Sequence, residues 1–334
     1  MMTRPLTESL FSSVPETSES SEIASFSRLW AKRYLENLSG ADPLRPDEDE
    51  WRSRQAAARF LKKALRTVSA QAWSKTEALL FQEVARHQID FELIDPWDIA
   101  KDAHQIYDQA FTSYAKRVTP QRFSAQISGS LGQIRTKYTS DDPRVIGFIS
   151  MQFHYTGQML LELLAPEDRT VVQSYFKVID DHLYMPLRRA YGAAANHTPD
   201  SVALQTVQRL LPNSSAIAHR IVDRTLELYP NHRCYTGLLR DSAVRVSSIR
   251  DVEMFQVYLW VCILENNIQA LQQELFPLCV MLYPVLNVRW ELVRQLVQLL
   301  GKEVQVLLEP DQLKLYAPYY RALWEMFSPE VFAD

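Results

Sequence analysis

Prolines divide this chain into segments that have the local chemistry of helices. The pairs Asp95-Pro96, Thr119-Pro120, Asp142-Pro143, Ala165-Pro166 and Glu309-Pro310 mark expected helix starts. Proline suits the first helical position because the N–H group that it lacks would have no partner there, and an oxygen-bearing side chain before it can cap the first turn. A sixth start is expected at Ser248-Ile249-Arg250-Asp251, which is close to a capping box. The sequence therefore predicts many separate helices.

Composition favours the same fold class. Only 8 of the 334 residues are glycine, while 47% are apolar and 23% are charged, which disfavours a turn-rich β architecture. We expect an all-α, multi-helix globular bundle of about a dozen or more helices, with enough length for two lobes. The most apolar run, Val257 to Leu264, falls short of the ~18 residues that span a membrane, so we expect a buried central helix. Three cysteines, two of them in apolar runs, favour reduced thiols and a cytoplasmic protein.

Charge and composition change along the chain. Residues 1–50 carry 5 basic and 10 acidic side chains, residues 51–140 carry 14 and 8, and residues 141–334 carry 17 and 22. The Ser-, Thr- and Glu-rich stretch 1–24 is expected to be a disordered tail, and Ser39–Asp47 is the best candidate for a linker. We expect an N-terminal helical lobe over 25–140 that contains a basic helix, and an apolar C-terminal helical lobe over 141–334.

Two segments resemble each other at an offset of 144 residues. The stretches Gly157–Asp181 and Gly301–Glu325 align without gaps, and five positions are identical: Gly157/Gly301, Leu163/Leu307, Leu164/Leu308, Pro166/Pro310 and Tyr175/Tyr319. Each has the pattern of a helix, a tight turn and a helix that starts with proline. The alignment fits either two unrelated helical hairpins of one type or an ancient duplication.

The stretch most suggestive of chemistry is Asp180-Asp181-His182. Because helical residues advance by ~100° each, Asp180 and His182 project about 160° apart and cannot hold one ion from a straight helix. We expect the two on opposite edges of an apolar stripe, with Asp181 exposed near Lys177 or Arg188. Pro186 could bend this helix. The segment is therefore expected to be structural.

Other signs of chemistry are sparse. No histidine is followed by another at i+4, and the sequence contains no Glu-x-x-His pair, P-loop, G-x-G-x-x-G or G-x-S-x-G motif. We therefore assign no catalytic residue and no metal site. Cys234, which follows His232 and Arg233, is a weak candidate nucleophile. His154 and His182 lie in apolar surroundings, where either could bind a tetrapyrrole or be a core histidine; any cofactor remains unknown.

The strongest functional signal is a basic helix face. Trp51 to Lys75 contains seven basic residues and no acid. On a helical wheel, one face carries the set that we name the basic stripe: Arg52, Arg59, Lys62, Lys63 and Arg66. Such a stripe is either a solvated surface or a docking surface for an acidic protein partner. Nucleic acid is disfavoured because the whole chain has a formal net charge of −4. Peripheral membrane contact and a homo-oligomer are left open.

The stretches VIDDHLYMPLRRAY and YYRALWEMFSPEVF resemble helical proteins of unknown role from cyanobacteria. The resemblance implies no site and, at most, a cytoplasm shared with photosynthetic machinery. Our leading hypothesis is a non-enzymatic interaction protein, namely a scaffold, adaptor or regulator that docks an acidic protein through the basic stripe. The alternatives are a helical protein that binds a cofactor such as a tetrapyrrole, and an enzyme with an unrecognised helical active site.

Overall fold

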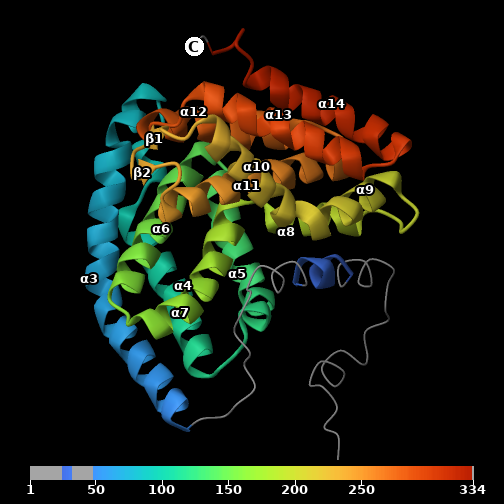
Figure 1. Cartoon of the computed structure of the whole chain (residues 1–334). Coiled ribbons are helices and arrows are strands. Elements are labelled where there is room, and N and C mark those ends of the chain that lie inside the picture. The colour runs from blue at the N-terminus through green and yellow to red at the C-terminus, as the bar shows by residue number, and fades with distance from the viewer. Residues whose placement is uncertain (1–24, 32–47, 333–334) are drawn as a thin grey trace, which may run out of the picture.

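The computed structural model describes residues 25–31 and 48–332 (Figure 1). The expected tail at 1–24 and the expected linker at Ser39–Asp47 lie outside these residues. After a helix at 25–31, the elements are α3 (Glu48–Arg86), η1 (Phe91–Leu93), α4 (Pro96–Ala115), α5 (Pro120–Thr139), η2 (Pro143–Val145), α6 (Ile146–Glu162), α7 (Pro166–Tyr184), α8 (Leu187–Ala195), α9 (Val202–Leu210), η3 (Leu211–Asn213), α10 (Ser214–Leu228), β1 (Arg233–Cys234), β2 (Gly237–Leu238), α11 (Ser242–Glu265), a π-helix (Ala270–Leu275), α12 (Phe276–Val285), α13 (Trp290–Leu307) and α14 (Pro310–Met326). The predicted all-α fold is confirmed.

Most of the expected helix starts are correct, and their caps form as the sequence predicts. The carboxylate of Asp95 accepts hydrogen bonds from two backbone N–H groups of α4, and the hydroxyl of Thr119 accepts one from α5. Glu309 forms a capping box at the start of α14. The start expected at Ser248 is wrong, because α11 runs through it from Ser242. There the hydroxyl of Ser248 donates to the carbonyl of Val244 within the helix, an alternative that serine side chains have in a continuous helix.

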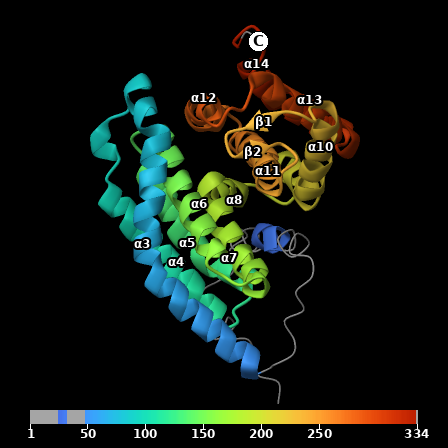
Figure 2. The ribbon, with the colours of Figure 1, turned by 60° about the vertical axis from the view of Figure 1, so that its left-hand side comes forward.

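The helices form two groups, which Figure 2 shows side by side. In the first group α3 packs on α4 and α6, and α7 packs on α5 and α6. In the second, α11 contacts α10, α13 and α14, and it also packs on α8. One apolar cluster extends through both groups. The boundary expected near residue 140 stays a prediction, and α6 and α7, which follow it, pack on helices that precede it.

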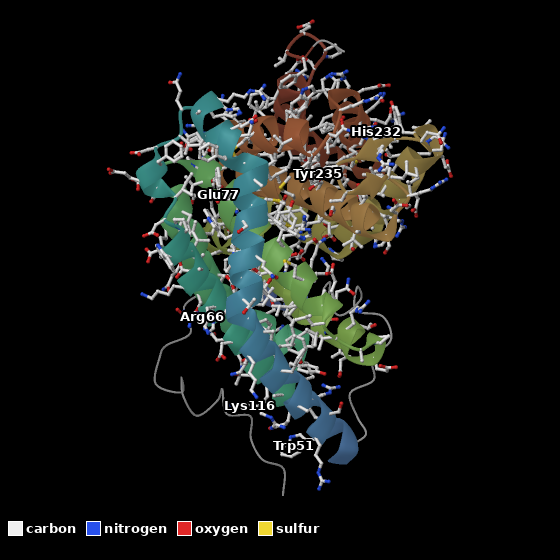
Figure 3. All side chains as sticks on the ribbon, turned by 90° about the vertical axis from the view of Figure 1, so that its left-hand side faces the viewer. Trp51, Arg66, Glu77, Lys116, His232 and Tyr235 are labelled. Atoms are coloured by element: carbon white, nitrogen blue, oxygen red, sulfur yellow. The ribbon has the colours of Figure 1, made fainter. Side chains whose placement is uncertain are left out.

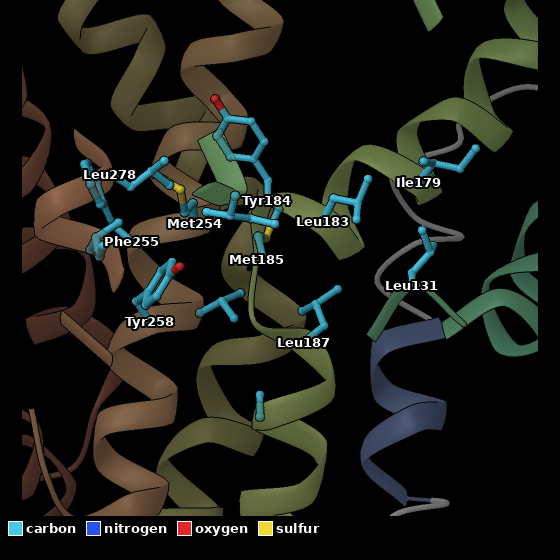
Figure 4. Packing of buried hydrophobic residues seen from close by; sticks show 14 of the residues in the cluster. Leu131, Ile179, Leu183, Tyr184, Met185, Leu187, Met254, Phe255, Tyr258 and Leu278 are labelled. Atoms are coloured by element: carbon cyan, nitrogen blue, oxygen red, sulfur yellow. The ribbon is translucent and has the colours of Figure 1, made fainter. Parts of the chain in front are cut away.

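The central helix of this arrangement is α11. Every residue from Val252 to Leu264 is buried, as expected for its apolar run, and Cys262 and Cys279 are buried free thiols. Figure 4 shows how the two groups meet, with the end of α7 and the start of α8 against α11 and α12: Tyr184, Met185 and Leu187 lie near Met254, Phe255, Tyr258 and Leu278.

The two similar segments both fold as helical hairpins. The tight turns fall between α6 and α7 and between α13 and α14, and α14 continues through Pro318. In each hairpin the glycine of the first helix lies against an aromatic ring of the second: a Cβ atom on Gly157 would meet Phe176, and one on Gly301 would meet Tyr320. Phe176 and Tyr320 are also 144 positions apart. The close superposition that a duplication requires stays a prediction.

Replacing Gly157 by alanine should lower the free energy of unfolding. A Cβ atom there would lie 2.8 Å from the hydroxyl oxygen of Tyr107, which is buried and donates a 2.7 Å hydrogen bond to the carbonyl of Phe153. Overpacking of this kind costs about 1–3 kcal/mol, more than the gain of about 1 kcal/mol in helix propensity. Gly129→Ala and Gly192→Ala, where a Cβ atom meets nothing within 4 Å, should instead raise stability. Urea unfolding of the three variants measures this, and equal effects would contradict the packing argument.

Candidate functional site

Asp180, Asp181 and His182 lie near the end of α7 and reach different partners. Oδ2 of Asp180 is 3.3 Å from Nη1 of Arg250 on α11 and 3.5 Å from Nδ1 of His154 on α6. Asp180 therefore joins three helices. No group of three or more His, Cys, Asp and Glu side chains in the described residues is placed to hold a metal ion.

The expectation that Asp181 is exposed is wrong. The residue is 1% exposed, although it does pair with the expected Lys177, whose Nζ donates to Oδ2 of Asp181 at 2.8 Å. The same Nζ lies 3.6 Å from Oε2 of Glu253 on α11. Asp181 faces away from the first group of helices, but α11 lies on that side and brings Glu253 near Lys177. Lys177 thus partly neutralises two carboxylates at a buried helix contact.

The two histidines proposed as cofactor ligands are separate. His182 is buried, its Nδ1 lies 2.8 Å from the carbonyl of Val178, and burial lowers its pKa. It is therefore a neutral core histidine that donates to its own helix. His154 is partly exposed and faces Asp180. Binding of a tetrapyrrole to either ring stays a prediction.

Two further features of the sequence have structural explanations. Pro186 ends α7, since α8 starts only at Leu187 and Met185 between them has extended backbone.

Cys234 is buried in the β1–β2 hairpin, and burial raises its pKa to about 11. Its thiol is consequently protonated at neutral pH, which removes the lowered pKa that a reactive cysteine needs.

A network of two arginines and two glutamates joins the helix groups, and the sequence did not suggest it. Arg135 of α5 donates to Oε2 of Glu274 at 2.9 Å and to the hydroxyl of Tyr258 at 2.6 Å. Arg189 of α8 binds both carboxylate oxygens of Glu265 at 2.6 Å and also pairs with Glu274. Glu274 lies in the π-helix. Burial lowers the pKa of Arg135, but Tyr258 and Glu274 outweigh that effect and raise it, so its charge is retained.

One acidic residue of α11, Asp251, has a pKa near neutral pH. Burial raises the pKa of Asp251 to about 7, although the neighbouring Arg250 opposes the shift. Its charge also acts on the side chains of Cys234, Cys279 and Tyr283. These three side chains are uncharged at neutral pH, and the guanidinium of Arg250 also contacts Asp180. Chemically, this region has one proton that can exchange near neutrality.

The basic stripe is only partly available at the surface. Nζ of Lys62 lies 2.7 Å from Oδ1 of Asp108 on α4 and 3.0 Å from the hydroxyl of Thr112. Lys62 therefore takes part in the α3–α4 contact, and its role in partner binding stays a prediction. The sequence could not show this because Asp108 is 46 residues away.

The other members of the stripe lie on the solvent side of α3. Arg52, Arg59, Lys63 and Arg66 are exposed, and within the described part of the chain Arg59, Lys63 and Arg66 have no ion-pair partner. Two aromatic side chains accompany these cations, with 48% of Trp51 and 50% of Phe60 exposed. Figure 3 faces this helix and shows Trp51 and Arg66 along it, with Lys116 beside it. Sequence reasoning missed the aromatic residues, although Phe60 directly follows Arg59.

Comparisons with protein-family models, curated proteins and solved structures find no match to this chain. The resemblance to helical cyanobacterial proteins therefore stays a prediction. Among the described residues, no helix combines the length and the apolar character needed to cross a bilayer.

Replacing Arg135 by methionine should lower the free energy of unfolding by about 3 kcal/mol or more. The change leaves a buried carboxylate with fewer partners, and breaking a buried pair costs about 3–5 kcal/mol. The control is Arg220→Met, which removes an exposed pair with Glu303 and should cost no more than about 1 kcal/mol. Guanidinium unfolding compares the two, and similar losses would show that the network stabilises little.

Asp251 should make stability fall as pH rises. The folded carboxyl binds its proton with a pKa of about 7, whereas in the unfolded chain its pKa is about 3.9. Between about pH 4 and 7 the folded state binds one proton more than the unfolded chain, so the free energy of unfolding falls over this range. The stabilisation by this proton is fully present below about pH 4 and is lost as pH rises through 7. The free energy of unfolding of Asp251→Asn, relative to that of the wild type, should rise by at least about 2 kcal/mol between pH 5 and pH 8. Urea unfolding at each pH measures this, with exposed Asp311→Asn as the control. Parallel pH profiles for wild type and Asp251→Asn would rule out the burial of this charge.

Proposed function

We propose that this chain is a non-enzymatic interaction protein, a scaffold, adaptor or regulator, that docks an acidic protein partner on the solvent side of α3. The observation that carries the proposal is the contrast within the basic stripe. Lys62 has an acidic neighbour at 2.7 Å, whereas Arg59, Lys63 and Arg66 are exposed and have no ion-pair partner in the described residues. No acidic side chain in the described residues pairs with these three exposed cations, so we infer that they serve a contact with another molecule.

The neighbouring aromatic residues support a protein partner. Arginine and aromatic side chains are enriched where protein interfaces derive most of their binding energy, and Phe60 and Trp51 are about half exposed beside the cations. An extended nucleic acid backbone is a poorer fit. Asp98, Asp102 and Asp108 lie on the adjacent α4, and the chain as a whole is acidic. We therefore favour a compact acidic surface of a protein.

Reversing three charges at once should abolish docking without unfolding the chain. In the variant Arg59→Glu, Lys63→Glu, Arg66→Glu, an acidic partner meets like charges, which cost several kcal/mol. We expect recovery of the partner from native lysate to fall at least about tenfold at low salt. Wild-type recovery should itself fall as salt rises, because exposed charges are screened. Mass spectrometry quantifies the captured proteins.

The matched control is Lys302→Glu, Lys314→Glu, Arg321→Glu. These residues are exposed on α13 and α14 and have no ion-pair partner in the described residues, so the net charge changes equally. A protein lost from both variants responds to net charge alone. The proposal fails if every captured protein is recovered equally by wild type and by the folded α3 variant at both salt concentrations.

A further inference from the structure

The solvent side of α3 has a second, apolar feature beside its cations. Exposed residues recur along the helix at the spacing of a helix–helix contact: Phe60, Thr67, Ala70, Ser74, Ala78 and Phe81. Their separations of 7, 3, 4, 4 and 3 positions keep them on one line. We name this line the α3 seam. Half or more of both phenylalanines is exposed, 50% of Phe60 and 56% of Phe81, and Figure 3 shows α3 in front of the other helices.

Four members of the α3 seam are symmetric about its midpoint. Phe60 and Phe81 are equally far from the point between Ala70 and Gln71, and so are Thr67 and Ser74, while Ala78 would face the exposed Lys63. Two copies placed antiparallel with this point on a twofold axis would set Phe60 of each against Phe81 of the other. Between the phenylalanines, small residues allow two helix backbones to approach closely. A parallel arrangement would instead place like residues together and would have no such match of side chains.

Charge complementarity selects the same arrangement. Arg66 and Glu77 are eleven positions apart, which is about three turns, so they project within ~20° of each other on one flank of the seam. Both are exposed, and neither has an ion-pair partner in the described residues. A twofold axis perpendicular to the helices brings the same flank of both copies together. Arg66 of each copy then lies about two residues along the axis from Glu77 of the other, which long side chains can bridge.

We propose that the occupant of the α3 seam is a second copy of this chain, in an antiparallel twofold dimer. The contact is isologous, as expected for a closed dimer. It goes beyond the proposed docking function and does not rest on it. Mostly small residues lie near its middle and the Phe60–Phe81 pairs lie at its two ends, while Arg52 and Arg59 lie on the flank toward the end of the paired region.

Engineered cysteines test the geometry. The native cysteines are all buried, so an introduced surface thiol is selective. Ala70→Cys lies at the twofold axis and should form a disulfide-linked dimer under mild oxidation. Phe60→Cys alone should not, because its two copies would be about 30 Å apart along the helices, whereas a mixture of Phe60→Cys and Phe81→Cys chains should cross-link. Efficient self-linking by Phe60→Cys, or failure of Ala70→Cys to link, would overturn the proposal.

Charge exchange tests the pairing. Arg66→Glu and Glu77→Arg should each weaken the dimer at least about tenfold, since each sets like charges together twice. The double variant should recover the affinity of the wild type, and Lys302→Glu should leave it unchanged. Sedimentation equilibrium measures the wild type and all four variants. A wild type that remains monomeric at high micromolar concentration, or a double variant no better than the singles, would refute the dimer.

Phe81 separates the dimer from partner docking. Phe81→Ser keeps every cation and both aromatic residues of the proposed docking surface, Trp51 and Phe60, and it should be monomeric with the helical circular dichroism of the wild type. A folded Phe81→Ser variant that still dimerises would overturn the proposal. Because its basic stripe is unchanged, its recovery of an acidic partner reports on docking alone, so either proposal can fail while the other stands.

Discussion

The arrangement of the two helix groups depends on charges that are buried where they meet. Arg135 is on α5 and Arg189 is on α8. Their partners lie across the contact, where Glu265 ends the central helix α11 and Glu274 lies in the π-helix that follows it. Charges taken out of water are costly unless geometry and hydrogen bonding are good. Apolar side chains tolerate sliding of one helix on another, but two arginines that share one glutamate tolerate little. The network therefore fixes the register of a contact whose area is supplied by apolar packing.

The π-helix acquires a role in this context. An i→i+5 turn is rare and usually marks a local requirement that an α-helix cannot meet. Here Glu274 lies in the turn and reaches arginines from two different helices, while Leu271 and Leu275 of the same turn are fully buried. The wider turn thus serves a charge contact and an apolar contact at once.

Local chemistry made much of the fold predictable, and distant contacts made part of the site unpredictable. A cap such as Asp95 acts on the backbone two and three residues ahead, so the four residues from Asp95 to Asp98 contain all that is needed. The burial of Asp181 depends on α11, about 70 residues later, and the pairing of Lys62 depends on α4. A helical wheel identifies a polar side of a helix, but it cannot say which other helix covers that side. This is why the sequence assigned Asp181 to solvent and did not show that Lys62 pairs with Asp108.

The solvent side of α3 shows the opposite situation, where the sequence identified the residues and the structure left them exposed. Helix stability does not account for their placement. Cations are favourable near the C-terminus of a helix and only within its last turn, whereas Arg59, Lys63 and Arg66 lie in the N-terminal half of α3. Packing accounts for little of Phe60 and Phe81, since the core contact of this helix is made from its other side by Leu61, Leu65 and Leu80, although the ring of Phe81 also lies 6.1 Å from that of Phe91. An aromatic residue left half in water gives up stabilisation that burial would supply. A single helix that carries both unexplained cations and unexplained aromatic residues on one side is best explained by contacts with other molecules.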